Sequence, residues 1–212
     1  MVKQTTTRDS TGIRGLDPLV SGGFNRDSIN LVVGEPGSGK TIFGIQFLVE
    51  GCKKGETGVY ITFEEKKEKL YEDMLSLGWD IKNFEKKGLF KFLEYTPEQI
   101  KKLLIEGGGS LDSLIQRTKV KRVVIDSITS FSLMYDNELA RKESALSLFD
   151  LINRWGCTAV LTSQGKNVGG ANVMDSSLEF EVDSIIILYH TKKRGKRVRG
   201  IEILKMRGTK VP

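Results

Sequence analysis

The chain has 212 residues, of which 39% are hydrophobic and 28% charged, and this composition is ordinary for one water-soluble domain with a sizeable core. No apolar run is long enough to span a bilayer, which excludes a membrane-spanning protein. Residues 1–8 are polar and lack the apolar core of a secretory signal, so we expect a single cytoplasmic domain over residues 1–212.

The formal net charge of +6 is concentrated at one end of the chain. Nine basic residues and one acid lie between Thr191 and Pro212, so the rest of the chain carries −2. This distribution excludes a uniformly basic nucleic-acid surface. Cys52 and Cys157 stand beside apolar segments and are predicted to be buried thiols rather than a disulfide.

Strands and helices are predicted to alternate, which indicates an α/β fold with a mostly parallel, twisted sheet flanked by helices on both faces. The expected strands are residues 28–33, 58–63, 89–93, 123–125 and 158–162. The expected helices are residues 41–52, 66–77, 97–105 and 137–155. Residues 107–110 and 165–173 are predicted loops, and residues 184–190 and 200–205 a C-terminal β-hairpin whose turn is the basic segment 192–199.

A complete phosphate-binding motif follows the first strand. The sequence Gly-Glu-Pro-Gly-Ser-Gly-Lys-Thr matches G-x-x-x-x-G-K-[ST], and it lies between a strand and a buried helix. Its glycines let backbone N–H groups turn toward an anion, and the helix that follows presents its unpaired N–H groups to the phosphates. The alternative, a glycine-rich turn without a ligand, would not explain this context. The predicted ATP-binding residues are Gly34, Glu35, Pro36, Gly37, Ser38, Gly39, Lys40, Thr41 and Ile42.

Two oxygen ligands are predicted for the Mg²⁺ ion that accompanies ATP. The hydroxyl of Thr41 is one, and the carboxylate of Asp126 is the other. Asp126 ends an apolar strand, which places it at the carboxyl edge of the sheet, where ligands of open α/β folds bind. A turn-capping role for Asp126 is the alternative.

Three further side chains are candidates for catalysis. Glu64 and Glu65 directly follow a strand, so one is expected to face the nucleotide as a base while the other braces it. The alternative is an acidic N-cap for the helix near Lys66. Gln164 ends another strand and is expected to sense the γ-phosphate, unless it is merely a polar strand end. His190, the one histidine, is expected to be solvated or at a sheet edge.

Several strings in this order resemble the KaiC-like ATPases of the RecA superfamily. The opening string runs from Thr11 to Asp17, and Gly22-Gly23 and the phosphate-binding motif follow it. The later strings are Thr62-Phe63-Glu64-Glu65, Val124-Ile125-Asp126-Ser127, Thr162-Ser163-Gln164 and Lys205-Met206-Arg207-Gly208-Thr209. The resemblance covers nearly the whole chain from Thr11, and the first and last strings are its most specific parts.

The resemblance implies a RecA-like core that assembles into rings, expected to be hexamers, with ATP between subunits. It also implies that Glu64 and Glu65 are catalytic, and that Lys205 and Arg207 act on the γ-phosphate of a neighbouring subunit. The structural alternative for these two cations is a pair of solvated charges on an edge strand. The family's two-domain clock proteins carry an autokinase Ser-Thr pair where this chain has Glu179 and Phe180, so we expect no autokinase there.

The leading hypothesis is therefore a ring-forming ATPase that hydrolyses ATP slowly and has a regulatory role, with a protein client left open. A DNA-binding ATPase of the RecA/RadA kind is an alternative. It needs basic and aromatic residues in loops that grip a strand, for which segment 130–137 offers Phe131 and Tyr135 without a base, and segment 165–173 offers Lys166 alone. The basic hairpin is the remaining candidate for nucleic-acid binding. A scaffold that ATP orders without turnover is the third hypothesis.

Overall fold

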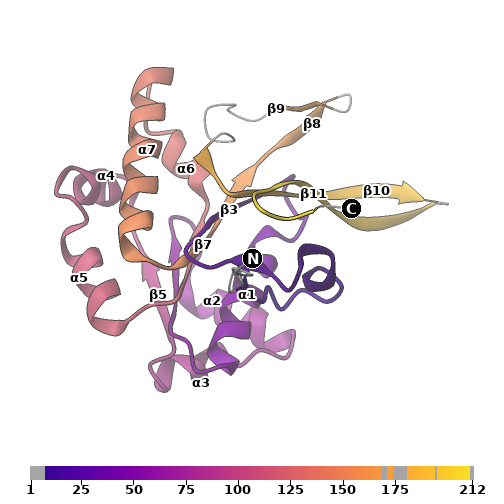
Figure 1. Ribbon diagram of the computed structural model, residues 1–212, viewed down its shortest axis with the longest axis horizontal. Helices are drawn as coiled ribbons and strands as arrows, with labels where there is room; N and C mark the ends of the chain where they lie inside the picture. The colour runs from indigo at the N-terminus through magenta and orange to yellow at the C-terminus, as the bar shows by residue number, and fades with distance from the viewer. Residues whose placement is uncertain (1–7, 169–170, 174–180, 194, 211–212) are drawn as a thin grey trace, which may run out of the picture.

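The computed structural model describes residues 8–168, 171–173, 181–193 and 195–210. It has an α/β architecture with a central seven-stranded sheet between two layers of helices (Figure 1). Glu179 and Phe180 lie outside the described residues. No helix in the described part of the chain combines the length and the apolar character needed to cross a bilayer.

The central sheet is parallel except at one edge, where the last two strands pair antiparallel. From edge to edge its strands are β11 (Lys196–Met206), β10 (Ser184–Lys193), β3 (Ile29–Gly34), β7 (Thr158–Gln164), β6 (Arg122–Asp126), β4 (Gly58–Thr62) and β5 (Phe90–Glu94). Two small antiparallel pairs add β1 (Arg8–Asp9) with β2 (Phe24–Asn25), and β8 (Lys166–Val168) with β9 (Ala171–Val173). This sheet confirms the predicted RecA-like fold class and its C-terminal hairpin.

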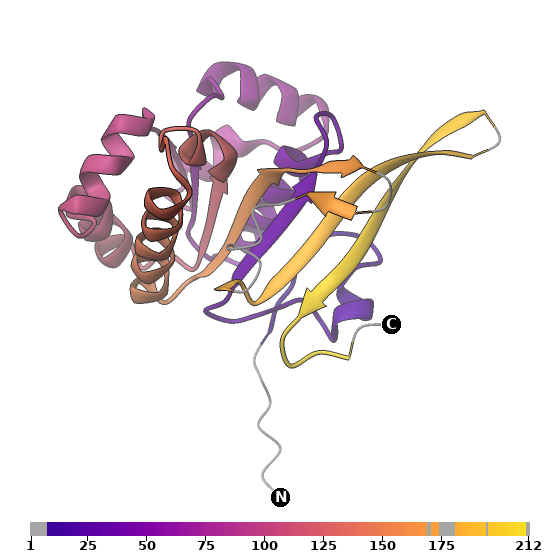
Figure 2. The same ribbon diagram turned by 90° about the horizontal axis from the view of Figure 1, so that it is seen from above.

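Helices cover both faces of the sheet, as Figures 1 and 2 show. One face is covered by α4 (Pro97–Ile105), α5 (Gly109–Thr118), α6 (Ile128–Ser132) and α7 (Glu138–Trp155). The other is covered by α1 (Lys40–Lys53), α2 (Lys67–Ser76), α3 (Ile81–Lys86) and the short 3₁₀ helix η1 (Asp17–Val20). Successive strand residues alternate between the two cores: Leu31 and Val33 belong to the first and Val32 to the second.

Most elements were predicted within a few residues of their bounds, but the helices α3, α5 and α6 were not. Helices α3 and α6 have six and five residues, too few to show a hydrophobic period. Helix α5 was hidden by the glycines before it. Gly108, with φ of 104°, is its N-cap, so the expected loop 107–110 is wrong beyond Gly108. The spacing of Leu111 and Ile115, both buried, is the signal that indicates this helix.

Two other predicted loops are also wrong in part. Segment 165–173 contains the paired strands β8 and β9. The basic segment 192–199 is not a turn, because β10 continues to Lys193 and β11 begins at Lys196. Basic side chains do not prevent strand pairing when the side chains reach solvent, so charge alone was a poor marker of the turn.

Both cysteines are buried free thiols, as predicted. Burial raises the pKa of Cys52 to about 12, and it raises the pKa of Cys157 to about 12 as well. Both thiols therefore stay protonated and unreactive at neutral pH.

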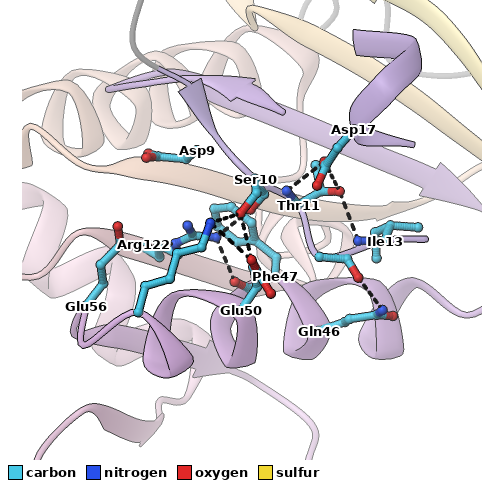
Figure 3. A network of polar contacts seen from close by, with 12 residues as sticks. Asp9, Ser10, Thr11, Ile13, Asp17, Gln46, Phe47, Glu50, Glu56 and Arg122 are labelled. Carbon is cyan, nitrogen blue, oxygen red and sulfur yellow. Dashed lines mark hydrogen bonds and ion pairs between the residues drawn. The ribbon is translucent and has the colours of Figure 1, made fainter. Parts of the chain in front are cut away.

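Helix α1 packs closely on β6 because two of its residues have no side chain. A Cβ on Gly44 would lie 2.8 Å from Val124, and a Cβ on Gly51 would lie 2.5 Å from the side chain of Arg122. Arg122, 1% exposed, crosses the helix at this point. Its guanidinium donates to Glu56 (2.6 Å), to the carbonyls of Ser10 (2.7 Å) and Phe47 (3.0 Å), and lies 4.6 Å from the Phe47 ring (Figure 3). One buried cation thus joins β6, α1 and the N-terminal segment.

The opening string of the sequence also attaches to α1. Asp17 accepts hydrogen bonds from the backbone N–H (2.8 Å) and the hydroxyl (2.6 Å) of Thr11, which closes the string into a compact loop (Figure 3). Gln46 of α1 donates to the Gly12 carbonyl at 2.6 Å. Gly12 has φ of 73°, and a Cβ there would lie 2.8 Å from Glu50. The string therefore needs glycine where it touches the helix that begins at the phosphate-binding loop.

We expect Glu56→Ala to destabilise the fold by about 1.5 to 3 kcal/mol, because it leaves a buried guanidinium short of its anionic partner. Urea unfolding monitored by circular dichroism measures this change. Glu106→Ala is the matched control: its ion pair with Lys102 is exposed and long, at 3.8 Å, so the expected loss is below about 0.5 kcal/mol. Equal effects of the two substitutions would contradict the structural role of Arg122.

Candidate nucleotide-binding site

The loop between β3 and α1 has the backbone that the phosphate-binding motif predicts. Gly37 and Gly39 have φ of 78° and 104°, a region that favours glycine, and a Cβ on either would meet no other atom within 4 Å. Gly34, by contrast, is packed: a Cβ there would lie 2.4 Å from the Ser38 hydroxyl. Glu35 and Pro36 are exposed on the loop, and Ile42 is half-buried on the first turn of α1. The loop is thus closed on the protein side and open on the other.

Lys40 is the first residue of α1 and its side chain lies along the loop. Its ammonium donates to the carbonyls of Gly34 (2.8 Å) and Glu35 (3.0 Å). Burial lowers the pKa of Lys40 from its usual range, and the negative charge of Asp126 partly offsets that effect. A cation that is partly desolvated gains more from an anion beside it than a solvated cation does.

Asp126 lies at the carboxyl end of β6 and is held by three hydroxyl groups. Thr41 (2.7 Å) and Tyr60 (2.7 Å) donate to Oδ2, and Thr162 (2.5 Å) donates to Oδ1. These donors come from α1, β4 and β7, so the two predicted Mg²⁺ ligands, Thr41 and Asp126, are in direct contact. Burial raises the pKa of Tyr60 far above its ordinary range, with the Asp126 charge as the second cause. Tyr60 therefore remains a hydrogen-bond donor.

These residues fit a triphosphate with Mg²⁺. The hydroxyl of Ser38 is buried beside Gly34 and has no hydrogen-bond partner among the described residues. The oxygens of Thr41 and Asp126 are the donor type that Mg²⁺ prefers. Lys40 would contact phosphate oxygens, and the ion would neutralise charge on them.

The two glutamates after β4 have different surroundings. Ser130 of α6 donates to Glu64 Oε1. Burial raises the pKa of Glu65, and the nearby Asp126 charge raises it further. The backbone N–H groups of both residues donate to the hydroxyl of Thr62, at 3.3 and 3.0 Å. Neither glutamate caps α2, because the N-cap is Lys66 and no side chain caps that helix, so the alternative role as an acidic cap is wrong.

Gln164 ends β7 directly beside the phosphate-binding loop. It is paired in register with Gly34, and its side chain is exposed. Its backbone N–H donates to the hydroxyl of Thr129 at 2.8 Å, and that hydroxyl lies 3.2 Å from the Ser163 hydroxyl. Thr129 therefore connects the end of β7 to α6, which also holds Glu64.

Lys205 and Arg207 are not brought to this site within one chain. Lys205 is paired with Ile185, three residues before the Leu188 that is paired with Gly34, and thus lies about 10 Å away along the strands. Its ammonium donates to the Val182 carbonyl at 2.7 Å. Arg207 lies beyond the end of β11, with its guanidinium 3.7 Å from Asp183. Both cations lie toward the amino end of β3, whereas the phosphate-binding loop follows the carboxyl end of that strand.

The two aromatic residues of segment 130–137 pack against each other, with Phe131 buried and Tyr135 half-buried. Phe131 is 2% exposed, and Tyr135 packs against it with ring centroids 5.4 Å apart. A buried ring cannot stack on a base, so Phe131 gives no support to the recombinase-like alternative.

Sequence reasoning missed Tyr60, Thr162, Ser130 and Thr129. Tyr60 and Thr162 lie on the two strands that flank β6. Their polar side chains need buried partners, but only the strand order connects them to the Asp126 carboxylate. Ser130 and Thr129 belong to α6, a helix that the sequence did not predict.

Comparison with known proteins gives consistent matches. The family model described as "ATPase: KaiC" matches residues 10–212. The chain is 36% identical over 207 residues to the circadian clock protein KaiC3 of Synechocystis sp., covering 94% of this chain and 41% of that protein. It is 34% identical over 218 residues to the UPF0273 protein PH0284 of Pyrococcus horikoshii, covering 96% and 87%. The chain thus spans about two fifths of the clock protein's length and most of the archaeal protein.

A solved structure is also similar. The crystal structure of the KaiC-like protein PH0186 from Pyrococcus horikoshii OT3 matches with a TM-score of 0.85 and 31% sequence identity. The match covers 98% of this chain and 92% of that one. The similarity therefore extends over the sheet, both helical layers and the hairpin.

Glu65→Gln is expected to make the ligand-free protein more stable at neutral pH and to change how stability depends on pH. Because the pKa of Glu65 is raised in the folded state, the wild-type protein loses stability as pH rises from the unfolded value, about 4.3, through the folded value. The advantage of the glutamine variant should therefore be small near pH 4 and larger at pH 7. Urea unfolding without Mg²⁺ at several pH values measures it, and a pH-independent difference would contradict the prediction.

Proposed function

The chain belongs to the KaiC family of P-loop ATPases, and from this we propose that it binds Mg²⁺-ATP at the carboxyl edge of its sheet and hydrolyses it slowly. The observation that carries the proposal is the contact between Thr41 and Asp126 beside a complete phosphate-binding loop. Lys40 and the loop N–H groups bind the phosphates, and Thr41 and Asp126 hold the Mg²⁺ ion. That ion supplies charge neutralisation on the phosphate oxygens.

We assign different roles to the two glutamates. Glu65, whose pKa is raised by burial and next by the Asp126 charge, is the base that aligns and deprotonates the attacking water. Glu64, bonded to Ser130, braces the turn and links it to α6. Gln164, aligned with Gly34, faces the same edge and senses the γ-phosphate.

We also propose that the site is completed by a second copy of the chain. Lys205 and Arg207 lie toward the opposite ends of the strands from their own phosphate-binding loop, and this position suits action on a neighbouring subunit. A cation that arrives from the neighbour stabilises charge on the phosphoryl oxygens only when the subunits are assembled. A closed ring, a hexamer by resemblance to the family, satisfies this arrangement because each subunit gives and receives one contact.

Glu65→Gln is expected to lower the rate of phosphate release by about 10² to 10⁴-fold while Mg²⁺-ATP still binds, because the base is lost but the phosphate contacts remain. Glu64→Gln and Ser130→Ala should resemble each other and cause a smaller loss. A single-turnover assay with a separate nucleotide-binding measurement gives both values. An undiminished rate in Glu65→Gln would overturn its assignment, and ATP binding without any phosphate release by the wild type would favour the scaffold hypothesis.

Mixing two inactive variants tests whether Arg207 acts on a neighbour. Arg207→Gln alone should lose about 10³-fold in turnover, and Lys40→Ala alone should not hold ATP. In an equimolar mixture, about a quarter of the sites combine an intact loop with an intact Arg207, so turnover should partly return.

Arg117→Gln, an exposed change on α5, is the matched control and should keep full turnover. Light scattering with and without Mg²⁺-ATP checks that subunits assemble under the conditions of the mixing assay. If they assemble and the mixture stays as inactive as its components, action in trans is refuted.

A further inference from the structure

The outer half of the β10–β11 hairpin extends beyond the rest of the sheet. Strand β10 pairs with β3 only from Ser184 to Leu188, whereas its pairing with β11 continues to Lys193. The five residues Tyr189–Lys193 therefore pair with β11 alone. They form a two-stranded ribbon that projects about 17 Å past the last row shared with β3 (Figures 1 and 2). We call Tyr189–Lys193 and their β11 partners, residues 196–200, the outer ribbon.

The sequence of the outer ribbon and its turn is strongly basic. Residues 190–199 contain six basic residues and no acid. The register pairs Lys192 with Arg197 and Lys193 with Lys196. Both strands of the ribbon thus carry basic residues at paired backbone positions, and like charges on paired strands are in general destabilising.

The described basic side chains of the outer ribbon reach solvent without a partner. Lys192, Lys196 and Arg199 are all exposed. Among the residues that the structure describes, no side chain forms an ion pair or hydrogen bond with any of these three. The chain before Thr191 carries a net charge of only −2, so it does not balance the positive charge concentrated in the ribbon.

We propose that the outer ribbon binds the phosphate backbone of double-stranded nucleic acid without sequence preference. A two-stranded ribbon is the right width for the major groove, which is about 12 Å wide. Each cation that meets a phosphate releases a condensed counterion, which is the main source of non-specific affinity for a duplex. This function is separate from ATP turnover and uses none of the residues of the nucleotide site.

The composition of the ribbon favours a duplex over a single strand. Single-strand binding relies on aromatic side chains on which bases stack, and residues 190–199 contain no Phe, Tyr or Trp. Tyr189 lies at the base of the ribbon against Gly200, where a Cβ would be 2.5 Å from its ring. Asn and Gln, which read adenine edges, are also absent from residues 190–199.

The same composition disfavours an acidic protein as the partner. Stable protein interfaces have an apolar or aromatic centre. Val198, 43% exposed, is the one large apolar residue in the sequence 190–199. One valine among six bases is a poor anchor for a protein but does not hinder binding to phosphates.

The test is fluorescence anisotropy of a labelled duplex of about 20 base pairs with the full chain, between about 50 and 200 mM salt. The variant Lys192→Gln/Lys196→Gln/Arg199→Gln should bind about 10 to 100-fold more weakly than wild type at about 0.1 M salt. The slope of log K against log salt should fall by about 3, because three cations that neutralise phosphates are removed. The control variant Lys82→Gln/Lys86→Gln/Lys87→Gln removes the same charge from exposed positions around α3 and should bind the duplex as wild type does.

Four outcomes would overturn the proposal. They are no duplex binding by wild type, equal binding by the ribbon and control variants, tighter binding of wild type to phosphatidylserine vesicles or polyglutamate than to the duplex, and tighter binding to a single strand of the same length. Mg²⁺-ATP affinity, measured in parallel, reports on the nucleotide site separately. If the ribbon variant bound ATP more weakly while keeping duplex affinity, the charges would belong to the nucleotide site instead.

Discussion

The carboxylate of Asp126 accepts hydrogen bonds from Thr41, Tyr60 and Thr162, and the geometry of the nucleotide edge depends on this convergence. The three donors come from α1 and from the two strands that flank β6, so the contact exists only when the strand order is correct and α1 packs closely. Gly44 permits that close packing. A buried anion is costly unless its hydrogen bonds are satisfied, and here folding itself supplies them. The proposed Mg²⁺ site is thus formed by the same contacts that hold the sheet and α1 together.

Different charged groups gather at the two ends of the parallel strands. The carboxyl edge gathers Lys40, Thr41, Asp126 and the glutamate pair, whereas Lys205 and Arg207 lie at the opposite edge, near the end of β11. Under the proposed function, a single chain holds the groups that bind and align ATP but not the cations that stabilise the transition state. Catalysis then depends on assembly, and the rate of turnover reports whether neighbouring subunits are in register. The N-terminal string, fastened to α1 by Gln46 and Gly12, places a further segment in contact with the helix that begins at the phosphates.

How much the sequence could predict differed between elements. The phosphate-binding loop, Asp126 and the strand ends were predictable because each depends on a local pattern: a motif, an apolar run and the residue that ends it. Helix α5 was missed because glycines resemble a break when their backbone angles are unknown, and α6 was too short to show a period. Tyr60 and Thr162 could not be connected to Asp126 without the strand order, which depends on long-range packing. The position of Arg207 away from its own loop likewise follows from the antiparallel return of β11, a feature of topology rather than of composition.

The outer ribbon is built differently from the sheet that carries it. Rows in the sheet interior have neighbours on both sides and helices above and below, whereas Tyr189–Lys193 have a single partner strand. Isolated two-stranded pairs are marginally stable in water. The amide protons of this part should therefore exchange with solvent through local opening, while those of β3, β6 and β7 exchange only when the whole domain unfolds. The fold thus joins a sheet interior with neighbours on every side to an extremity held by a single strand pairing.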